Sequence, residues 1–130
     1  MLENIIEYIK QKYNPLSIIL YGSYANGTNN LNSDFDALVI TADHGRFHDT
    51  SFVDGIPLDV FVYPAKYFES SYSCEDFVQI FDGRIVTDSS GIGKALQETV
   101  RAYLKNRPGS TAWIFSAISC SSRILGLKKH

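Results

Sequence analysis

The chain has 130 residues, of which 45% are hydrophobic and 20% are charged. This composition excludes a disordered chain, and the length allows one domain with an appendage at most. Twelve basic against 14 acidic residues give a net charge of -2, which argues against long nucleic acid as a partner. The two cysteines, Cys74 and Cys120, are expected to be reduced, buried thiols. No stretch is apolar enough for a membrane span or a signal peptide, so we expect a cytoplasmic protein.

The first third of the chain predicts a helix, two strands and a sharp turn between them. Apolar residues at helical spacing predict an amphipathic helix over residues 2–13, which Asn14-Pro15 ends. Residues 16–21 are rich in β-formers, and Gly22-Ser23 ends this strand. The polar residues 24–33 predict a short helix and a loop, and residues 34–41 predict the second strand.

The middle of the chain predicts an exposed connection and a β-hairpin. Residues 42–50 are expected to form the connection. His44 and His48 have the spacing of zinc ligands on a helix, but Gly45 favours a solvated loop instead. Residues 51–53, the turn Asp54-Gly55 and residues 56–63 predict the hairpin.

The second half predicts helices and one more strand. Pro64 suits the first turn of a helix, and Ser73 with the acidic residues after it suits the start of another. After Gly83, residues 84–87 predict a strand, and residues 92–104 predict a long helix that Pro108-Gly109 ends. We therefore expect a domain over residues 1–108. The Ser-rich residues 109–130 would be an atypical tail, either a further helix or the remnant of a longer chain.

Two further patterns have ordinary structural interpretations. The segment Gly91-Ile92-Gly93-Lys94 lacks the first glycine and the final Ser or Thr of a phosphate loop, so it predicts a helix start. Four aromatic residues after the hairpin could stack on a nucleotide base, but aromatic residues in such places more often belong to the core or its rim. They are Tyr63, Tyr67, Phe68 and Tyr72.

The carboxylates of Asp34 and Asp36 lie two residues apart at the start of the second predicted strand. Side chains at i and i+2 of a strand point to the same face, so these carboxylates lie close together. At about 6 Å and an effective dielectric constant of about 20, two such charges repel by roughly 3 kcal/mol. Solvent, one shared proton or a divalent cation can offset this repulsion. Paired carboxylates with phosphate oxygens are a ligand set that suits Mg²⁺.

A third carboxylate, Asp59, lies within the apolar strand 56–63, where an acid without a partner would be costly to bury. If this strand lies beside the one that holds Asp34 and Asp36, the three carboxylates form a metal site. In the alternative, Asp34 and Asp36 are solvated at a strand entrance and Asp59 faces water on an edge hairpin.

The step from strand to helix at Gly22-Ser23 supplies the complementary half of a phosphate site. The free N–H groups at the start of a helix bind phosphate oxygens without a lysine. Gly22 lets the backbone approach a ligand closely, and Ser23 can cap the helix or donate its hydroxyl to a phosphate. A metal on one side and a helix end on the other is an arrangement suited to phosphoryl or nucleotidyl transfer.

Gly22-Ser23, ten intervening residues, Asp34-x-Asp36 and the later Asp59 resemble the active-site signature of the DNA polymerase beta-like nucleotidyltransferases. The resemblance covers roughly residues 1–88. It is strongest to the small stand-alone domains called minimal nucleotidyltransferases and to the catalytic half of kanamycin-type enzymes. It implies an α+β fold with a short mixed, mainly antiparallel sheet flanked by helices.

The resemblance also implies a reaction and a set of site residues. The three carboxylates would be catalytic and would hold two Mg²⁺ ions, which Mn²⁺ can replace, and Asp59 would also help to deprotonate the acceptor hydroxyl. Gly22, Ser23 and Ser33 would contact the nucleotide. The expected reaction moves a nucleoside monophosphate from a nucleoside triphosphate, ATP foremost, to a hydroxyl of a protein or small molecule, with pyrophosphate as the leaving group.

Two other functions stay open at this point. One is an antitoxin-like subunit that binds a separately encoded helical toxin of the HEPN type, with or without modifying it with AMP. The other is a non-catalytic relative that only binds nucleotide. The acceptor, the base preference and the oligomeric state are left undetermined by the sequence, and a homo-oligomer is one of the arrangements it allows.

Overall fold

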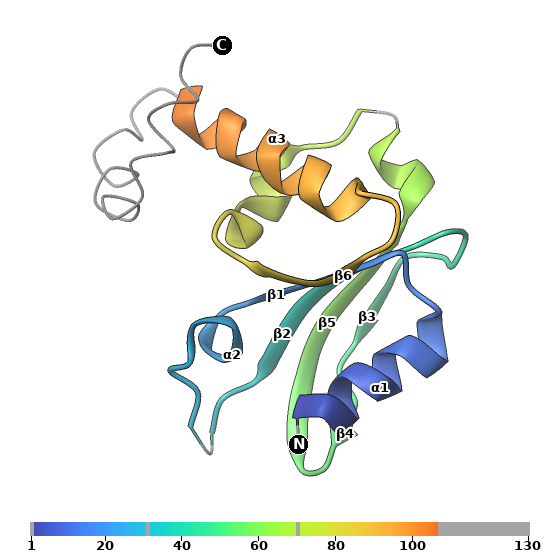
Figure 1. Ribbon diagram of the computed structural model, residues 1–130, viewed down its shortest axis with the longest axis vertical. Helices are drawn as coiled ribbons and strands as arrows, with labels where there is room; N and C mark the ends of the chain where they lie inside the picture. The colour runs from blue at the N-terminus through green and yellow to red at the C-terminus, as the bar shows by residue number, and fades with distance from the viewer. Residues whose placement is uncertain (1, 31, 70, 107–130) are drawn as a thin grey trace.

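The computed structural model describes residues 2–30, 32–69 and 71–106. Their centre is a six-stranded sheet with the strand order β3-β5-β2-β1-β6, in which β4 pairs with β5 (Figure 1). Only β2 and β5 pair in parallel among the described strands, and the remaining pairs are antiparallel. The predicted α+β fold with a mixed, mainly antiparallel sheet is therefore confirmed. The strands are β1 (Ser17–Tyr21), β2 (Phe35–Thr41), β3 (Phe47–Asp49), β4 (Phe52–Val53), β5 (Ile56–Pro64) and β6 (Arg84–Asp88).

Helices cover both faces of this sheet. In Figure 1, α1 (Leu2–Tyr13) lies on one side of the strands and α3 (Ile92–Asn106) on the other. Because side chains alternate along a strand, β1 and β2 supply apolar residues to both layers. The α1 layer includes Ile5, Ile9, Ile18, Leu20, Ala37 and Val39. The α3 layer includes Ile19, Leu38, Ile40, Phe77, Leu96 and Val100.

The predicted helices at both ends of the described chain are confirmed, but those after Pro64 and Ser73 are 3-10 helices instead. They are η1 (Ala65–Phe68) and η2 (Cys74–Ile80), and Pro64 itself is the last residue of β5. Within η2, Phe77 leaves the helical region, with φ −124° and ψ 15°, while its side chain is buried. The aromatic residues singled out in the sequence pack around this ring as core and rim: Tyr63, Tyr67, Phe68 and Tyr72.

The expected exposed connection over residues 42–50 is wrong at its end, because β3 forms there and pairs with β5. Although this segment is polar in composition, one of its acidic residues, Asp49, is buried. Asp49 is only 1% exposed, which the sequence pattern does not reveal. The buried Asp49 side chain holds β3 in place, a role that an apolar side chain usually has in a strand.

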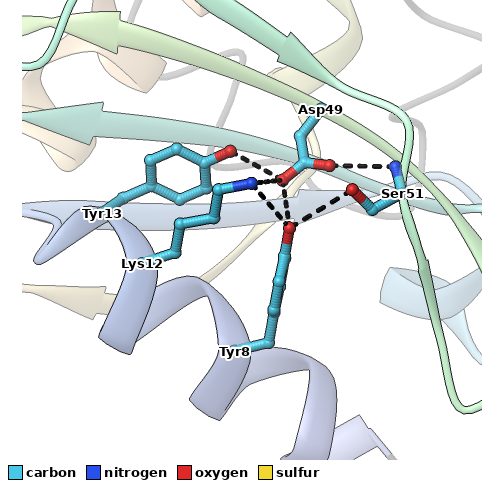
Figure 2. Close-up of polar contacts among 5 residues, drawn as sticks. All are labelled: Tyr8, Lys12, Tyr13, Asp49 and Ser51. Atoms are coloured by element: carbon cyan, nitrogen blue, oxygen red, sulfur yellow. Dashed lines mark hydrogen bonds and ion pairs between the residues drawn. The ribbon is translucent and has the colours of Figure 1, made fainter.

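Asp49 joins the edge of the sheet to α1 through a hydrogen-bond network (Figure 2). The hydroxyls of Tyr13 and Tyr8 donate to its Oδ2 at 2.6 and 2.7 Å, and the backbone N–H of Ser51 donates to its Oδ1 at 2.9 Å. Lys12 adds an ion pair at 3.6 Å. Burial alone would raise the pKa of Asp49, but these hydrogen bonds outweigh it and hold the pKa far below its ordinary range.

We expect Asp49→Asn to lower the free energy of unfolding by about 3 kcal/mol near neutral pH, because asparagine cannot replace the charged acceptor. Since folding lowers the pKa from 3.8, this contribution is complete above that value and disappears as the pH falls toward the folded pKa. Urea unfolding at about pH 7 and about pH 2.5 tests it, and the difference between the two proteins should be smaller at the lower pH. The control Asp54→Asn removes an exposed acid with one hydrogen bond from Asn4, and an equal loss there would contradict the prediction.

The helices in the described part of the chain include none with the length and apolar composition that crossing a membrane requires. Cys74 is a free thiol, but it is partly exposed and not buried as expected. The predicted helix stop at Pro108-Gly109, the predicted tail over residues 109–130 and Cys120 lie outside the described residues.

Candidate active site

A pair of carboxylates stands at the centre of the candidate site. β2 and β5 run in parallel with Asp36 opposite Asp59, so the two side chains lie on the same sheet face. Partial burial is the largest cause that raises the pKa of Asp36, and the neighbouring charge and hydrogen bond of Asp59 add to it, giving a value of about 6. The charge of Asp34 makes a smaller contribution in the same direction. Asp34 itself is exposed and lies one residue before β2.

Gly22 lies next to the carboxylate of Asp36, on the side of β2 away from β5. Tyr21 pairs with Asp36 in the antiparallel β1–β2 ladder, so the residue that follows β1 comes close to that carboxylate. The backbone of Gly22 has φ 75° and ψ −157°, a conformation that only glycine adopts readily. A Cβ at this position would overlap the Oδ2 of Asp36 and lie 3.3 Å from its Cγ. Glycine is therefore required here for conformation and for space.

The predicted turn from strand to helix is present, although the helix is a single turn. α2 (Ser23–Asn26) follows Gly22, which occupies the N-cap position and accepts hydrogen bonds from the backbone of Ala25 and Asn26. No side chain caps this helix, so Ser23 does not act as the cap. The hydroxyl of Ser33, which we expect to contact nucleotide, accepts a hydrogen bond from the backbone of Asn30 within the loop before β2.

Sequence reasoning missed His48, which contacts the acid pair directly. Its Nε2 lies 2.5 Å from the Oδ1 of Asp59, and its ring stacks on Phe61 at 4.1 Å with an interplanar angle of 7°. The hydrogen bond occupies one oxygen of Asp59 and limits how the carboxylate can turn. The register of β3 against β5 sets this contact, and a polar three-residue strand gives little signal of its register in the sequence.

Tyr21 is a second residue near the carboxylates that was not among the site residues predicted from the sequence. Burial raises the pKa of its hydroxyl, a hydrogen bond with Gln79 opposes that rise, and the charges of Asp36 and Asp59 add to it. The phenol therefore stays neutral and lies within the field of both carboxylates. The sequence pattern indicates only an apolar residue at a strand end.

The chemistry of this donor set fits a divalent cation. Among the described residues, no group of three or more His, Cys, Asp or Glu side chains is arranged as a metal cage. Mg²⁺ does not require one, because it is commonly held by one or two carboxylates together with water and substrate phosphates. Asp36 and Asp59 would provide two such ligands, and a bound cation would relieve their mutual repulsion. The arrangement therefore fits a divalent cation with a phosphate beside it.

Comparison with known proteins shows to which family the chain belongs. The family model described as "Nucleotidyltransferase domain" matches residues 2–80, more than half of the chain. None of the curated proteins compared with the chain matches it. A crystal structure described as "the toxin-antitoxin with AMP-PNP" is 19% identical, covers 90% of this chain and 97% of that one, and has a TM-score of 0.52. A crystal structure of a mutant of "the toxin-antitoxin MntA-HpeT" is 16% identical, covers 92% of this chain and 98% of that one, and has a TM-score of 0.53.

The chain belongs to the nucleotidyltransferase domain family. It is a transferase of phosphorus-containing groups, as the Gly-Ser and carboxylate pattern predicted. The two solved structures share its fold over most of its length.

Proposed function

We propose that this protein transfers the AMP moiety of ATP to a hydroxyl group of a protein partner, with Mg²⁺ as the cofactor. The observation that carries the proposal is the in-register pair of Asp36 and Asp59 beside the glycine turn at Gly22. The pair offers ligands for a cation, and the turn lets phosphates approach the backbone closely. The resemblance of the fold to a structure described with AMP-PNP, an analogue of ATP, supports ATP as the donor.

In this proposal each part of the site has a defined task. The acceptor oxygen forms a bond to the α-phosphorus of ATP, the bond from that phosphorus to the bridging oxygen breaks, and pyrophosphate leaves with the electron pair. Asp59 accepts the proton of the acceptor hydroxyl, and Gly22 and Ser23 contact the phosphates. Asp34, Asp36 and Asp59 would hold Mg²⁺, which when bound supplies charge neutralisation at the phosphates.

ATP labelled at different phosphates tests the proposal. With ATP labelled at the α-phosphate and Mg²⁺, the label should appear on an acceptor protein of a host lysate and pyrophosphate should be released. With label at the γ-phosphate, none should be transferred. Transfer of the γ-label would show a kinase instead, and binding of AMP-PNP without turnover would show a nucleotide-binding relative. Chelation by EDTA should stop transfer, and Mn²⁺ should restore it.

A second candidate function is that of an antitoxin-like subunit with a helical protein partner. It is favoured because the two solved structures compared above are described as toxin-antitoxin structures. The two functions are compatible if the partner is also the acceptor. Purification from the native host separates them: a stable complex whose partner carries no AMP would support the antitoxin role without the transferase role.

A further inference from the structure

A pocket of about 360 Å³ is lined by residues of β3 and β5 and by Arg46, and one of its lining residues, His48, contacts Asp59. Its lining residues are Arg46, Phe47, His48, Phe61, Val62 and Tyr63. In the β3–β5 register His48 is opposite Phe61, and Phe61 follows Asp59 by two residues, so all three side chains lie on one sheet face. His48 is therefore both a wall of the pocket and the hydrogen-bond partner of Asp59.

The position of this pocket in the sheet suits an acceptor. β2 lies between β1 and β5, so Gly22 after β1 and Asp59 on β5 flank Asp36 from opposite sides. In-line transfer requires the acceptor to attack from the side opposite the leaving pyrophosphate. With the phosphates at Gly22, as proposed above, the acceptor must approach over β5. The pocket is lined by residues of β5 and of its neighbour β3, which lie on that side of Asp36.

Arg46 gives this pocket a positive charge. Its guanidinium lies over the rings of Tyr63 and Tyr67, at 5.1 and 5.0 Å from their centroids. Such stacking fixes the plane of a guanidinium while its N–H donors remain available. Arg46 is exposed and makes no ion pair with the residues that the structure describes. The Arg46 guanidinium is fixed in orientation and its N–H groups are available, so a carboxylate or a phosphate is a suitable ligand for it.

The pocket face of β3 allows an extended segment to lie over it, close to Asp59 on the neighbouring β5. β3 ends the strand order, and the Asp49 network ties its last residue to α1, so the edge is firmly held. Arg46 and His48 are two residues apart, which corresponds to about 7 Å in extended chain. An extended segment beside them presents its own residues i and i+2 on one face at the same spacing.

We propose that this pocket selects the acceptor, which is a protein segment with a carboxylate two residues from the reacting hydroxyl. The hydroxyl faces Asp59 and His48, and the carboxylate binds Arg46. This inference rests on the proposed function, since it assigns the acceptor side of the same site. It adds a specificity determinant, Arg46, which is not among the residues proposed to contact the nucleotide or the cation.

Short synthetic peptides with α-labelled ATP and Mg²⁺ test this proposal. Each peptide carries one Ser, Thr or Tyr with Glu, Ala or Lys two residues away on both sides. Labelling of the Glu peptides should exceed that of the Lys peptides by about ten-fold. Arg46→Glu should reverse this preference, because the charge that selects the peptide is inverted. Arg84→Glu changes an exposed arginine on β6, at the far edge of the sheet, and should leave the preference as it is.

Each outcome decides between the proposals. Equal labelling of the three peptide classes, or a Glu preference that survives Arg46→Glu, overturns the acceptor assignment. The acceptor assignment is also overturned if the enzyme hydrolyses ATP to AMP and pyrophosphate but labels none of the peptides. In that case the proposed function is not overturned. Absence of both pyrophosphate release and AMP-PNP binding would instead overturn the proposed function, and the acceptor assignment with it.

Two controls apply to the Arg46→Glu and Arg84→Glu variants. Their AMP-PNP affinity and their thermal unfolding midpoint should match those of the wild type. If Arg46→Glu unfolds early, Arg46→Gln replaces it, and the preference should then vanish.

Discussion

Asp36→Asn is expected to abolish nucleotidyl transfer while the protein stays folded. The asparagine keeps the shape of the side chain but removes one of two facing carboxylates, so the site loses a cation ligand. We expect a fall in kcat/KM of about a thousand-fold, which corresponds to about 4 kcal/mol of transition-state stabilisation. Asp59→Asn should have an effect of the same size. Pyrophosphate release under saturating Mg²⁺ measures both.

A stability measurement distinguishes loss of the site from loss of the fold. Without divalent cations, Asp36→Asn should unfold at a temperature about 4 °C higher than wild type, because removing the repulsion between Asp36 and Asp59 is worth about 1 kcal/mol. Asp34→Asn serves as the matched control, since Asp34 is exposed and adds less to the field at Asp36. Wild-type turnover in Asp36→Asn, or a lower unfolding temperature, would show that the carboxylate pair is not a cation site.

Gly22→Ala is the second substitution with a large expected effect. The added Cβ meets the Oδ2 of Asp36, and the overlap is relieved most easily if the Asp36 carboxylate rotates. That rotation moves the carboxylate away from its position beside Asp59. We therefore expect a fall in turnover of about a hundred-fold, with a loss of about 2 kcal/mol in stability from the unfavourable backbone conformation.

Gly27→Ala provides the control within the same loop. Gly27 also has positive φ, at 79°, but a Cβ there meets nothing within 4 Å. It should cost about 1 kcal/mol of stability from backbone strain alone and leave turnover near the wild-type value. If the two variants lose turnover equally, the contact of Gly22 with Asp36 is not the cause. Chemical unfolding and pyrophosphate release on the same preparations provide both readouts.

Most of the fold follows from local patterns in the sequence. The helix ending at Asn14-Pro15, the strand before Gly22 and the hairpin around Asp54-Gly55 each have a terminator with a clear conformational preference. The errors lie where tertiary contacts override local signals. β3 depends on the buried Asp49, whose partners on α1 are more than thirty residues away in the chain. The predicted helix after Ser73 is present, but it is a 3-10 helix that leaves helical geometry at the buried Phe77.

Some residues of the candidate site could likewise be predicted from the sequence, and others could not. The motif of Gly22 and the carboxylates could be read from spacing, and the parallel register brings Asp36 and Asp59 together as the strand pattern suggested. His48 and Arg46 could not be found in this way. Their contacts with Asp59 and with Tyr63 arise from the pairing of an edge strand, and that pairing has no local sequence signature.

The parallel pairing of β2 with β5 also determines where the chain can change in length. A single residue inserted in β5 ahead of Asp59 would turn this carboxylate toward α1, because alternate residues of a strand point to opposite faces. An insertion in residues 42–45, before β3, leaves that pairing unchanged. Length variation in that connection can therefore reshape the entrance beside Arg46 while the carboxylate pair is retained. Relatives with this fold could diverge in what they modify without losing their chemistry.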